Sequence, residues 1–159
     1  MLKTKKSSSL QASTLIFTWG NPSRGDDGLG PMIYQRLKNE SWVDVELLTD
    51  FQLQIEHMLD LENRNTIIFI DASVSAKPPF EYYQIYPTQD ESYTSHAMSP
   101  QSLLAVYQKV NQQQPPSAFM LSIRGYEFGL GLSLSKEATK NMEEAFSYIK
   151  NSIIPLEQT

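Results

Sequence analysis

The chain contains no cysteine. This absence excludes disulfide bonds, thiolate zinc sites, iron–sulfur clusters and cysteine nucleophiles together. Histidine is nearly as scarce, because His57 and His96 are the only two in 159 residues. A serine triad would have few histidines to draw on, and the sequence contains neither a G-x-S-x-G nor an H-E-x-x-H motif. Any catalysis would therefore use oxygen and nitrogen groups.

Positive charge and long apolar runs are also in short supply. Lys and Arg total 13 against 18 Asp and Glu, for a formal net charge of −5, and such a chain offers no basic face for a phosphate backbone. No apolar run approaches the roughly 20 residues of a membrane span. The basic start leads into serines rather than an apolar segment, unlike a signal peptide. We therefore expect a soluble, cytoplasmic protein with neither nucleic acid nor membrane as a partner.

What is present indicates one α/β domain. A length of 159 residues with 40% hydrophobic residues fits one compact core. Strand-like segments alternate with helix-like ones, which predicts a single three-layer domain with a twisted, mainly parallel, five-stranded sheet flanked by helices. We expect this domain to span residues 14–154, after a disordered leader at 1–13 and before a tail at 155–159.

Some elements have a predicted place in that domain. The continuously apolar segment 66–71 suits a strand covered on both faces, so we place it at the centre of the sheet. The aromatic segment 82–86 is typical of an edge or near-edge strand. Segments 31–38 and 51–61 read as helices, with His57 a partly exposed helix residue. Their expected inward side chains are Met32, Ile33, Leu37, Leu53, Ile55, Met58, Leu59 and Leu61.

The segment "WGNPSRGDDGLG", residues 19–30, lies where phosphate-binding loops usually lie. Gly20 and Gly25 have the spacing of such a loop, but Asp26 and Asp27 replace the Lys-Ser/Thr pair that would hold phosphate and magnesium. Two negative charges repel phosphate and attract a cation. We assign Asp26 to capping the following helix and Asp27 to a functional site. Arg24 could pair with Asp26, which we favour, or with a substrate carboxylate.

Two further residues complete a candidate metal site. Asp71 ends the predicted central strand, and His96 stands just before a helix start in "SHAMSPQSLL". Alone, Asp71 could accept hydrogen bonds at a turn and His96 could be an ordinary loop residue. Because the carboxyl ends of parallel strands meet at one edge of a sheet, we expect Asp27, Asp71 and His96 to converge there. Two carboxylates and an imidazole suit a divalent ion such as zinc or nickel.

Four segments in this order, "WGNPSRGDDGLGP", "IIFIDAS", "SHAMSPQSLL" and "FGLGLS", resemble the hydrogenase maturation endopeptidases, which process the large subunit of nickel–iron hydrogenases. The resemblance covers residues 15–153. It implies that Asp27, Asp71 and His96 bind the metal and carry the catalysis. It also implies removal of a short C-terminal peptide from the large-subunit precursor after nickel loading. The expected metal is the nickel of the substrate, with zinc or cadmium as surrogates.

The sequence departs from that family at one motif and leaves several questions open. Many members have Asp-Gly-Gly-Thr after the second strand, whereas this chain keeps the aspartate, Asp50, and lacks the glycines. "QLQIEH" and "RGYEFGLGLS" look more like the branch serving bidirectional NAD(P)-linked hydrogenases. The metal could be catalytic or only a recognition element, and Glu56 and His57 could contact the precursor. The alternatives are a non-cleaving module that senses the metal-loaded large subunit and a nucleotide-binding protein.

Overall fold

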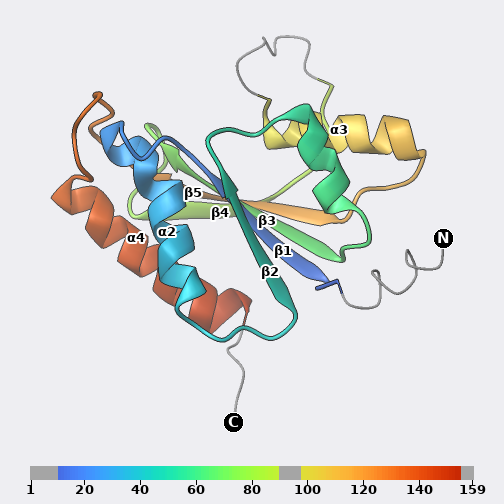
Figure 1. Ribbon diagram of the computed structural model, residues 1–159, viewed down its shortest axis with the longest axis horizontal. Helices are drawn as coiled ribbons and strands as arrows, with labels where there is room; N and C mark the ends of the chain where they lie inside the picture. Colours follow the sequence, from blue (N-terminus) through green and yellow to red (C-terminus); the bar gives the residue numbers. More distant parts are fainter. Residues whose placement is uncertain (1–10, 90–97, 155–159) are drawn as a thin grey trace.

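The structure, a computed structural model, describes residues 11–89 and 98–154. Its five strands form one twisted sheet in the order β2-β1-β3-β5-β4 (Figure 1). The pairs β1–β2, β1–β3 and β3–β5 are parallel, and β4 is antiparallel to β5. The predicted mainly parallel five-stranded sheet is therefore confirmed. The strands are β1 Thr14–Trp19, β2 Val45–Asp50, β3 Thr66–Ser73, β4 Phe80–Ile85 and β5 Ser117–Arg124.

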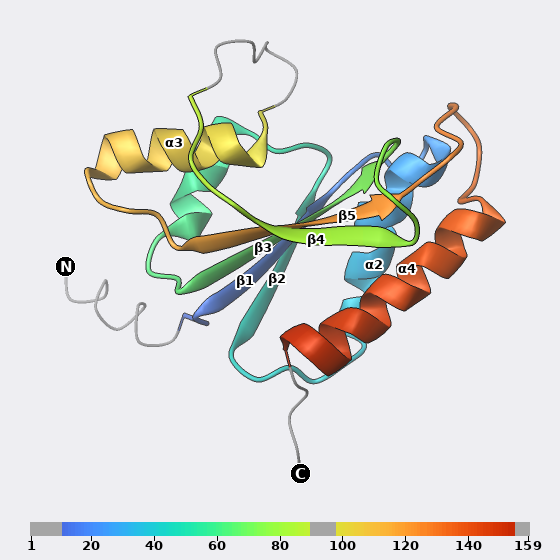
Figure 2. The ribbon, with the colours of Figure 1, turned by 180° about the vertical axis from the view of Figure 1, so that it is seen from behind.

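Helices cover both faces of this sheet, as Figures 1 and 2 show. Helices α2 and α4 lie on one face, and α3 and the short helix η2 lie on the other. This arrangement confirms the predicted three layers. Within the described residues, no helix has the length and apolar character needed to cross a membrane. The helices are η1 Gly25–Gly28, α2 Leu29–Lys38, η2 Ile55–Leu61, α3 Pro100–Asn111, α4 Lys136–Tyr148 and η3 Ile149–Ile153.

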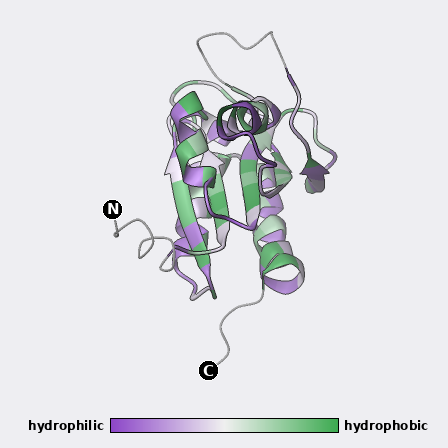
Figure 3. Cartoon of the chain, turned by 90° about the vertical axis from the view of Figure 1, so that its right-hand side faces the viewer, coloured by the Kyte–Doolittle hydropathy of each residue, from purple (hydrophilic) through white to green (hydrophobic). Residues whose placement is uncertain are grey.

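The central strand β3 separates two hydrophobic clusters. Ile68 and Ile70 point to the cluster beneath α2 and α4, and Ile67 and Phe69 point to the cluster beneath α3 and η2. All four side chains are fully buried. Successive side chains of a strand point to opposite faces, which is why a strand covered on both sides must be apolar throughout. Hydrophobic residues accordingly concentrate along the strands in Figure 3.

Two predictions about the helices were wrong. The segment expected to form an α-helix at 51–61 forms the 3₁₀ helix η2, and its Ile55 and Leu59 are exposed while Leu61 is buried. A 3₁₀ helix has three residues per turn, so the α-helical spacing used for the prediction does not apply. In α2, Ile33 is buried as predicted, but Met32 is exposed. The N-cap of α3 is Ser99, whose hydroxyl accepts the Ser102 N–H at 3.0 Å.

Candidate functional site

Asp71 lies at the C-terminal edge of the sheet, inside β3. The strand was predicted to end at Asp71, but it continues to Ser73 because pairing with β5 continues to that residue. Pairing of β3 with β1 stops at Ile70, opposite Thr18, one residue before Asp71. Asp71 is therefore held by a regular strand on one side and faces the loop after β1 on the other.

The surroundings of Asp71 disfavour its charged form. Burial, followed by the negative charge of Asp27, raises the pKa of Asp71 to about 7 from a usual value of 3.8. Hydrogen bonds from the Ala72 N–H, at 2.8 Å, and from the Trp19 side chain offset only part of this effect. Two carboxylates that share a partly buried site relieve their repulsion by keeping a proton or by binding a cation.

Asp27 belongs to η1, immediately after the loop that follows β1. Its Oδ2 accepts the Asn21 N–H at 2.7 Å, which fixes the carboxylate across the loop. A Cβ at Gly20 would lie 2.0 Å from the Asp27 carbonyl oxygen, so only glycine allows the chain to pass there. Asp27 is near enough to Asp71 for its charge to raise the pKa of Asp71, and the site roles assigned to the two residues stay predictions.

The neighbouring Asp26 has a different environment. It is fully buried, and its Oδ2 accepts the backbone N–H groups of Tyr126 at 2.7 Å and Glu127 at 3.0 Å. The backbone N–H of Ser135 donates to Oδ1 at 2.7 Å, and the Ser135 hydroxyl donates to Oδ2 at 2.8 Å. Burial alone would raise the pKa of Asp26, but these hydrogen bonds outweigh it and lower the pKa below 3.8.

The predicted cap and ion pair at Asp26 were therefore wrong. The N-cap positions of η1 and α2 are Arg24 and Gly28, and neither forms a side-chain cap hydrogen bond. Arg24 forms no ion pair with Asp26, whose oxygens are occupied by four donors from the loop between β5 and α4. Asp26 therefore ties its own loop to the loop between β5 and α4.

The third predicted ligand, His96, lies outside the described residues. Within 11–89 and 98–154, no three His, Cys, Asp or Glu side chains form a group that could hold a metal ion. The two carboxylates fit a divalent cation, because they are partly buried, repel each other and, in the same ranges, form no ion pair with a basic side chain. The role of His96 as a ligand stays a prediction.

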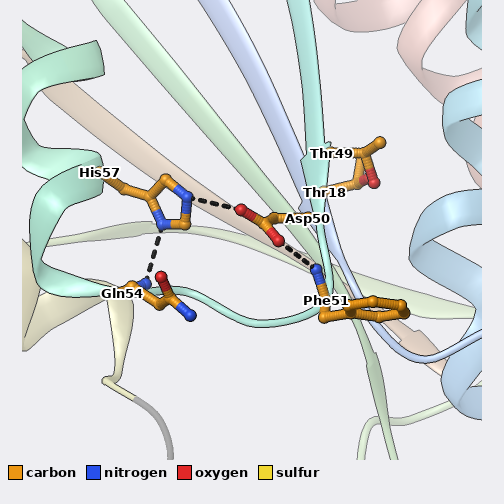
Figure 4. Close-up of polar contacts among 6 residues, drawn as sticks. All are labelled: Thr18, Thr49, Asp50, Phe51, Gln54 and His57. Carbon is orange, nitrogen blue, oxygen red and sulfur yellow. Dashed lines mark hydrogen bonds and ion pairs between the residues drawn. The ribbon is translucent and has the colours of Figure 1, made fainter.

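Sequence reasoning missed the contact between His57 and Asp50. His57 is 8% exposed, not partly exposed as predicted, and packs edge-on against Phe17 with ring centroids 4.6 Å apart. Its Nδ1 accepts the Gln54 N–H at 2.8 Å, so the proton lies on Nε2, which donates to Asp50 Oδ2 at 3.0 Å (Figure 4). The available signal was the three-residue spacing of Gln54 and His57, which is that of a capping box.

A groove of about 250 Å³ lies where β1 and β2 end. We call it the β2 groove; it is lined by Gly20, Pro22, Pro31, Thr49, Asp50 and Phe51. Phe51 is 67% exposed, so the groove has an apolar wall that water reaches. Gly20 also abuts the backbone of Asp27. The β2 groove is therefore continuous with the loop that carries the candidate site.

Known structures share this architecture. No protein-family model and no curated protein matches the sequence. The [NiFe] hydrogenase maturation protease HycI from Thermococcus kodakarensis KOD1 superposes with a TM-score of 0.69 at 17% identity, over 94% of this chain and 98% of that one. The hydrogenase maturating endopeptidase HybD from E. coli superposes with a TM-score of 0.63 at 18% identity, over 89% of this chain and 94% of that one. A hydrogenase 2 maturation peptidase from Thaumarchaeota archaeon SCGC_AB-539-E09 superposes with a TM-score of 0.62 at 22% identity, over 88% of this chain and 97% of that one. The chain thus has the fold of the [NiFe] hydrogenase maturation proteases, the family that its sequence motifs resemble.

Proposed function

We propose that the chain is an endopeptidase that removes a C-terminal peptide from the nickel-loaded precursor of a NiFe-hydrogenase large subunit. The observation that carries this proposal is the pairing of Asp27 and Asp71 at the C-terminal edge of the sheet, in a fold that hydrogenase maturation proteases share. The sequence around Gln52 and Tyr126 favours a precursor of the bidirectional, NAD(P)-linked type.

In this proposal Asp27 and Asp71 hold a divalent cation together with His96. A cation bound there would polarise the scissile carbonyl and acidify a water molecule, or it would be the precursor's own nickel, captured as the sign that loading is complete. Asp71 would release its proton as the cation binds, because the added positive charge relieves the repulsion from Asp27. Asp26 would keep the loop of Asp27 in place without contacting the substrate.

The direct test is processing of a nickel-loaded large-subunit precursor, followed by mass spectrometry. The wild-type chain should shorten the precursor at its C-terminus, and Asp27→Asn, Asp71→Asn and His96→Ala should each abolish the shortening while the variants stay folded. Retained cleavage by Asp27→Asn or His96→Ala would count against their proposed roles. A stable complex with a precursor of unchanged mass would identify a non-cleaving sensor instead.

A further inference from the structure

We propose that the free edge of β2, together with the β2 groove, binds an extended segment of the polypeptide substrate as an added strand. This inference rests on the proposed function for the identity of the substrate. The observation behind it is a strand edge, next to the loop of Asp27, whose outward backbone groups have no partner among residues 11–89 and 98–154.

The direction of the free backbone groups follows from the β1–β2 pairing. The carbonyl oxygens of Asp44 and Asp50 accept the N–H groups of Thr14 and Gly20, at 3.3 and 3.1 Å. Backbone groups alternate in direction along a strand, so the even-numbered residues of β2 face β1 and the odd-numbered ones face away. The outward N–H and C=O groups are those of Val45, Leu47 and Thr49. Within the described residues, no strand lies beyond this edge.

This edge lacks the usual features that prevent strand addition. Exposed edges are commonly protected by lysine, proline, a bulge or free charges. The sequence of β2, "VELLTD", has no lysine or proline. Both of its acidic side chains are engaged elsewhere, Glu46 with Arg64 at 2.6 Å and Asp50 with His57 at 3.0 Å.

The two ends of the edge carry exposed hydrophobic side chains. Val43, just before β2, is 54% exposed, and Phe51, just after it, is 67% exposed. Phe51 also forms a wall of the β2 groove, and its own N–H is satisfied by Asp50 Oδ1 at 2.7 Å (Figure 4). Strand pairing thus stops at Thr49, where the groove begins.

These groups define the chemistry of the ligand. Unpaired backbone N–H and C=O groups recognise another extended backbone, and an adjoining apolar groove selects one side chain of it. The groove contacts the Asp27 loop through Gly20. A peptide added to β2 would therefore lead from the strand edge, through the groove, to the loop that carries Asp27. For a peptidase, this arrangement positions the chain that is to be cut.

The first experiment substitutes Thr49→Pro. Proline removes the outward N–H and places its ring where the added strand would lie, and it removes no backbone hydrogen bond to β1. It also removes the Thr49 hydroxyl, which accepts the Thr18 hydroxyl at 2.8 Å, so Thr49→Val serves as the control for that loss. We expect KM for the nickel-loaded precursor to rise about tenfold, the loss of one or two backbone hydrogen bonds to the ligand. Gln84→Pro is the matched control, because β4 is the opposite edge of the sheet and Gln84 is exposed with its N–H directed away from β5. It should leave KM unchanged.

The second experiment measures hydrogen exchange of the wild-type chain with and without a synthetic peptide of the precursor's C-terminal region. The amides of Val45, Leu47 and Thr49 should slow on addition of the peptide, and those of Tyr82 and Gln84 should not. This measurement does not depend on whether the proline variant folds.

The outcomes separate this inference from the proposed function. Normal cleavage with no protection of the β2 amides and no effect of Thr49→Pro overturns the inference and leaves the peptidase assignment standing. Protection of β2 by the peptide without any cleavage supports the inference and overturns the assignment. A concentration-dependent dimer that protects β2 without peptide would mean that a second copy of the chain occupies the edge, which also overturns the inference.

Discussion

Asp26 and Asp27 are adjacent in the sequence, but their carboxylates meet different surroundings. Asp26 is fully buried and accepts four hydrogen bonds from the loop before α4. Asp27 accepts one backbone N–H and stands next to Asp71, whose pKa it raises. Saturation with donors stabilises a folded loop, whereas an uncompensated charge beside another acid costs stability and favours cation binding.

Asp26→Asn should therefore destabilise the protein without touching the site chemistry. The amide places an NH₂ group among donors, so at least one buried N–H or hydroxyl loses its acceptor, and we expect the free energy of unfolding to fall by about 2–4 kcal/mol. Urea unfolding at pH 7 measures this change. Asp27→Asn is the matched control and should lie within about 1 kcal/mol of the wild type. Equal stability of Asp26→Asn and the wild type would contradict the role of Asp26 in holding the two loops together.

The hydrogen bonds of Asp26 also predict how the stability changes at acid pH. The folded-state pKa of Asp26 lies below its usual 3.8, so the stability that it contributes is present above about pH 4. It is lost as the pH falls from there through the lowered folded-state pKa. The stability difference between the wild type and Asp26→Asn should accordingly be constant from pH 7 to 5 and shrink between pH 4 and 3. Urea unfolding across this range checks the trend, and a constant difference would contradict it.

Asp71 should change the stability with pH in the opposite direction to Asp26. Its folded-state pKa of about 7 lies above the usual 3.8, so the metal-free folded state keeps a proton that the unfolded state releases. Stability should fall as pH rises from about 4 to about 7. Asp71→Asn removes this penalty, and in EDTA at pH 8 it should be more stable by on the order of 1–3 kcal/mol, with no gain at pH 4. Thermal unfolding measures this, with Glu144→Gln on α4 as the control for removing an exposed charge. An Asp71→Asn variant less stable than the wild type at pH 8 would contradict the inference that the charged form of Asp71 is unfavourable beside Asp27.

At the scale of elements, η2 fixes the end of β2. His57 joins the two, because its ring accepts from Gln54, donates to Asp50 and packs on Phe17 of β1. Both nitrogens are therefore used in one tautomer. The 3₁₀ helix keeps a buried imidazole where an α-helical pattern predicted a partly exposed one.

The variant His57→Phe tests the contact that His57 makes between η2 and the end of β2. The variant keeps an aromatic ring against Phe17 and loses both hydrogen bonds, which leaves the Gln54 N–H without an acceptor. We expect the free energy of unfolding to fall by about 2 kcal/mol. Urea unfolding measures the change, and His57→Ala should cost more because it also removes the buried ring. A His57→Phe variant as stable as the wild type would show that the polar contacts contribute nothing.

Elements with a strong local pattern were predictable from the sequence. The apolar run of β3 indicated its central place in the sheet. Topology led us to expect Asp27 and Asp71 at one edge of the sheet, since parallel strands present their ends there, and the charge of Asp27 does raise the pKa of Asp71. The partners of Asp26 and Asp50 could not be predicted, because the contacts of Asp26 join residues about one hundred positions apart and those of Asp50 depend on a helix type that the pattern did not reveal.

At the scale of the whole molecule, one sheet carries both proposed functions. Its C-terminal edge presents the carboxylates of Asp27 and Asp71, and its β2 edge presents backbone groups for a peptide. The net charge of −5 is opposite in sign to the proposed cation. A rigid sheet can hold the peptide and the metal at a fixed separation, which is what selective cleavage requires.

Cation binding by the proposed site should raise the stability of the whole molecule. A ligand at one hundred times its dissociation constant stabilises the folded state by about 2.7 kcal/mol, which for a chain of this size is a rise in Tm of roughly 5–10 °C. We expect nickel or zinc to produce this rise at pH 8, where Asp71 has lost its proton. Differential scanning calorimetry in EDTA and in excess metal measures it.

Asp27→Asn, Asp71→Asn and His96→Ala should each abolish the rise, because each removes one donor of the set. His57→Ala is the matched control, since it removes the other histidine of the chain and should leave the rise intact although its starting Tm is lower. A rise in Tm that survives in all three site variants would mean that the metal binds elsewhere. A rise that His96→Ala alone retains would reduce the site to the two carboxylates, and the imidazole would then have to be removed from the proposed ligand set.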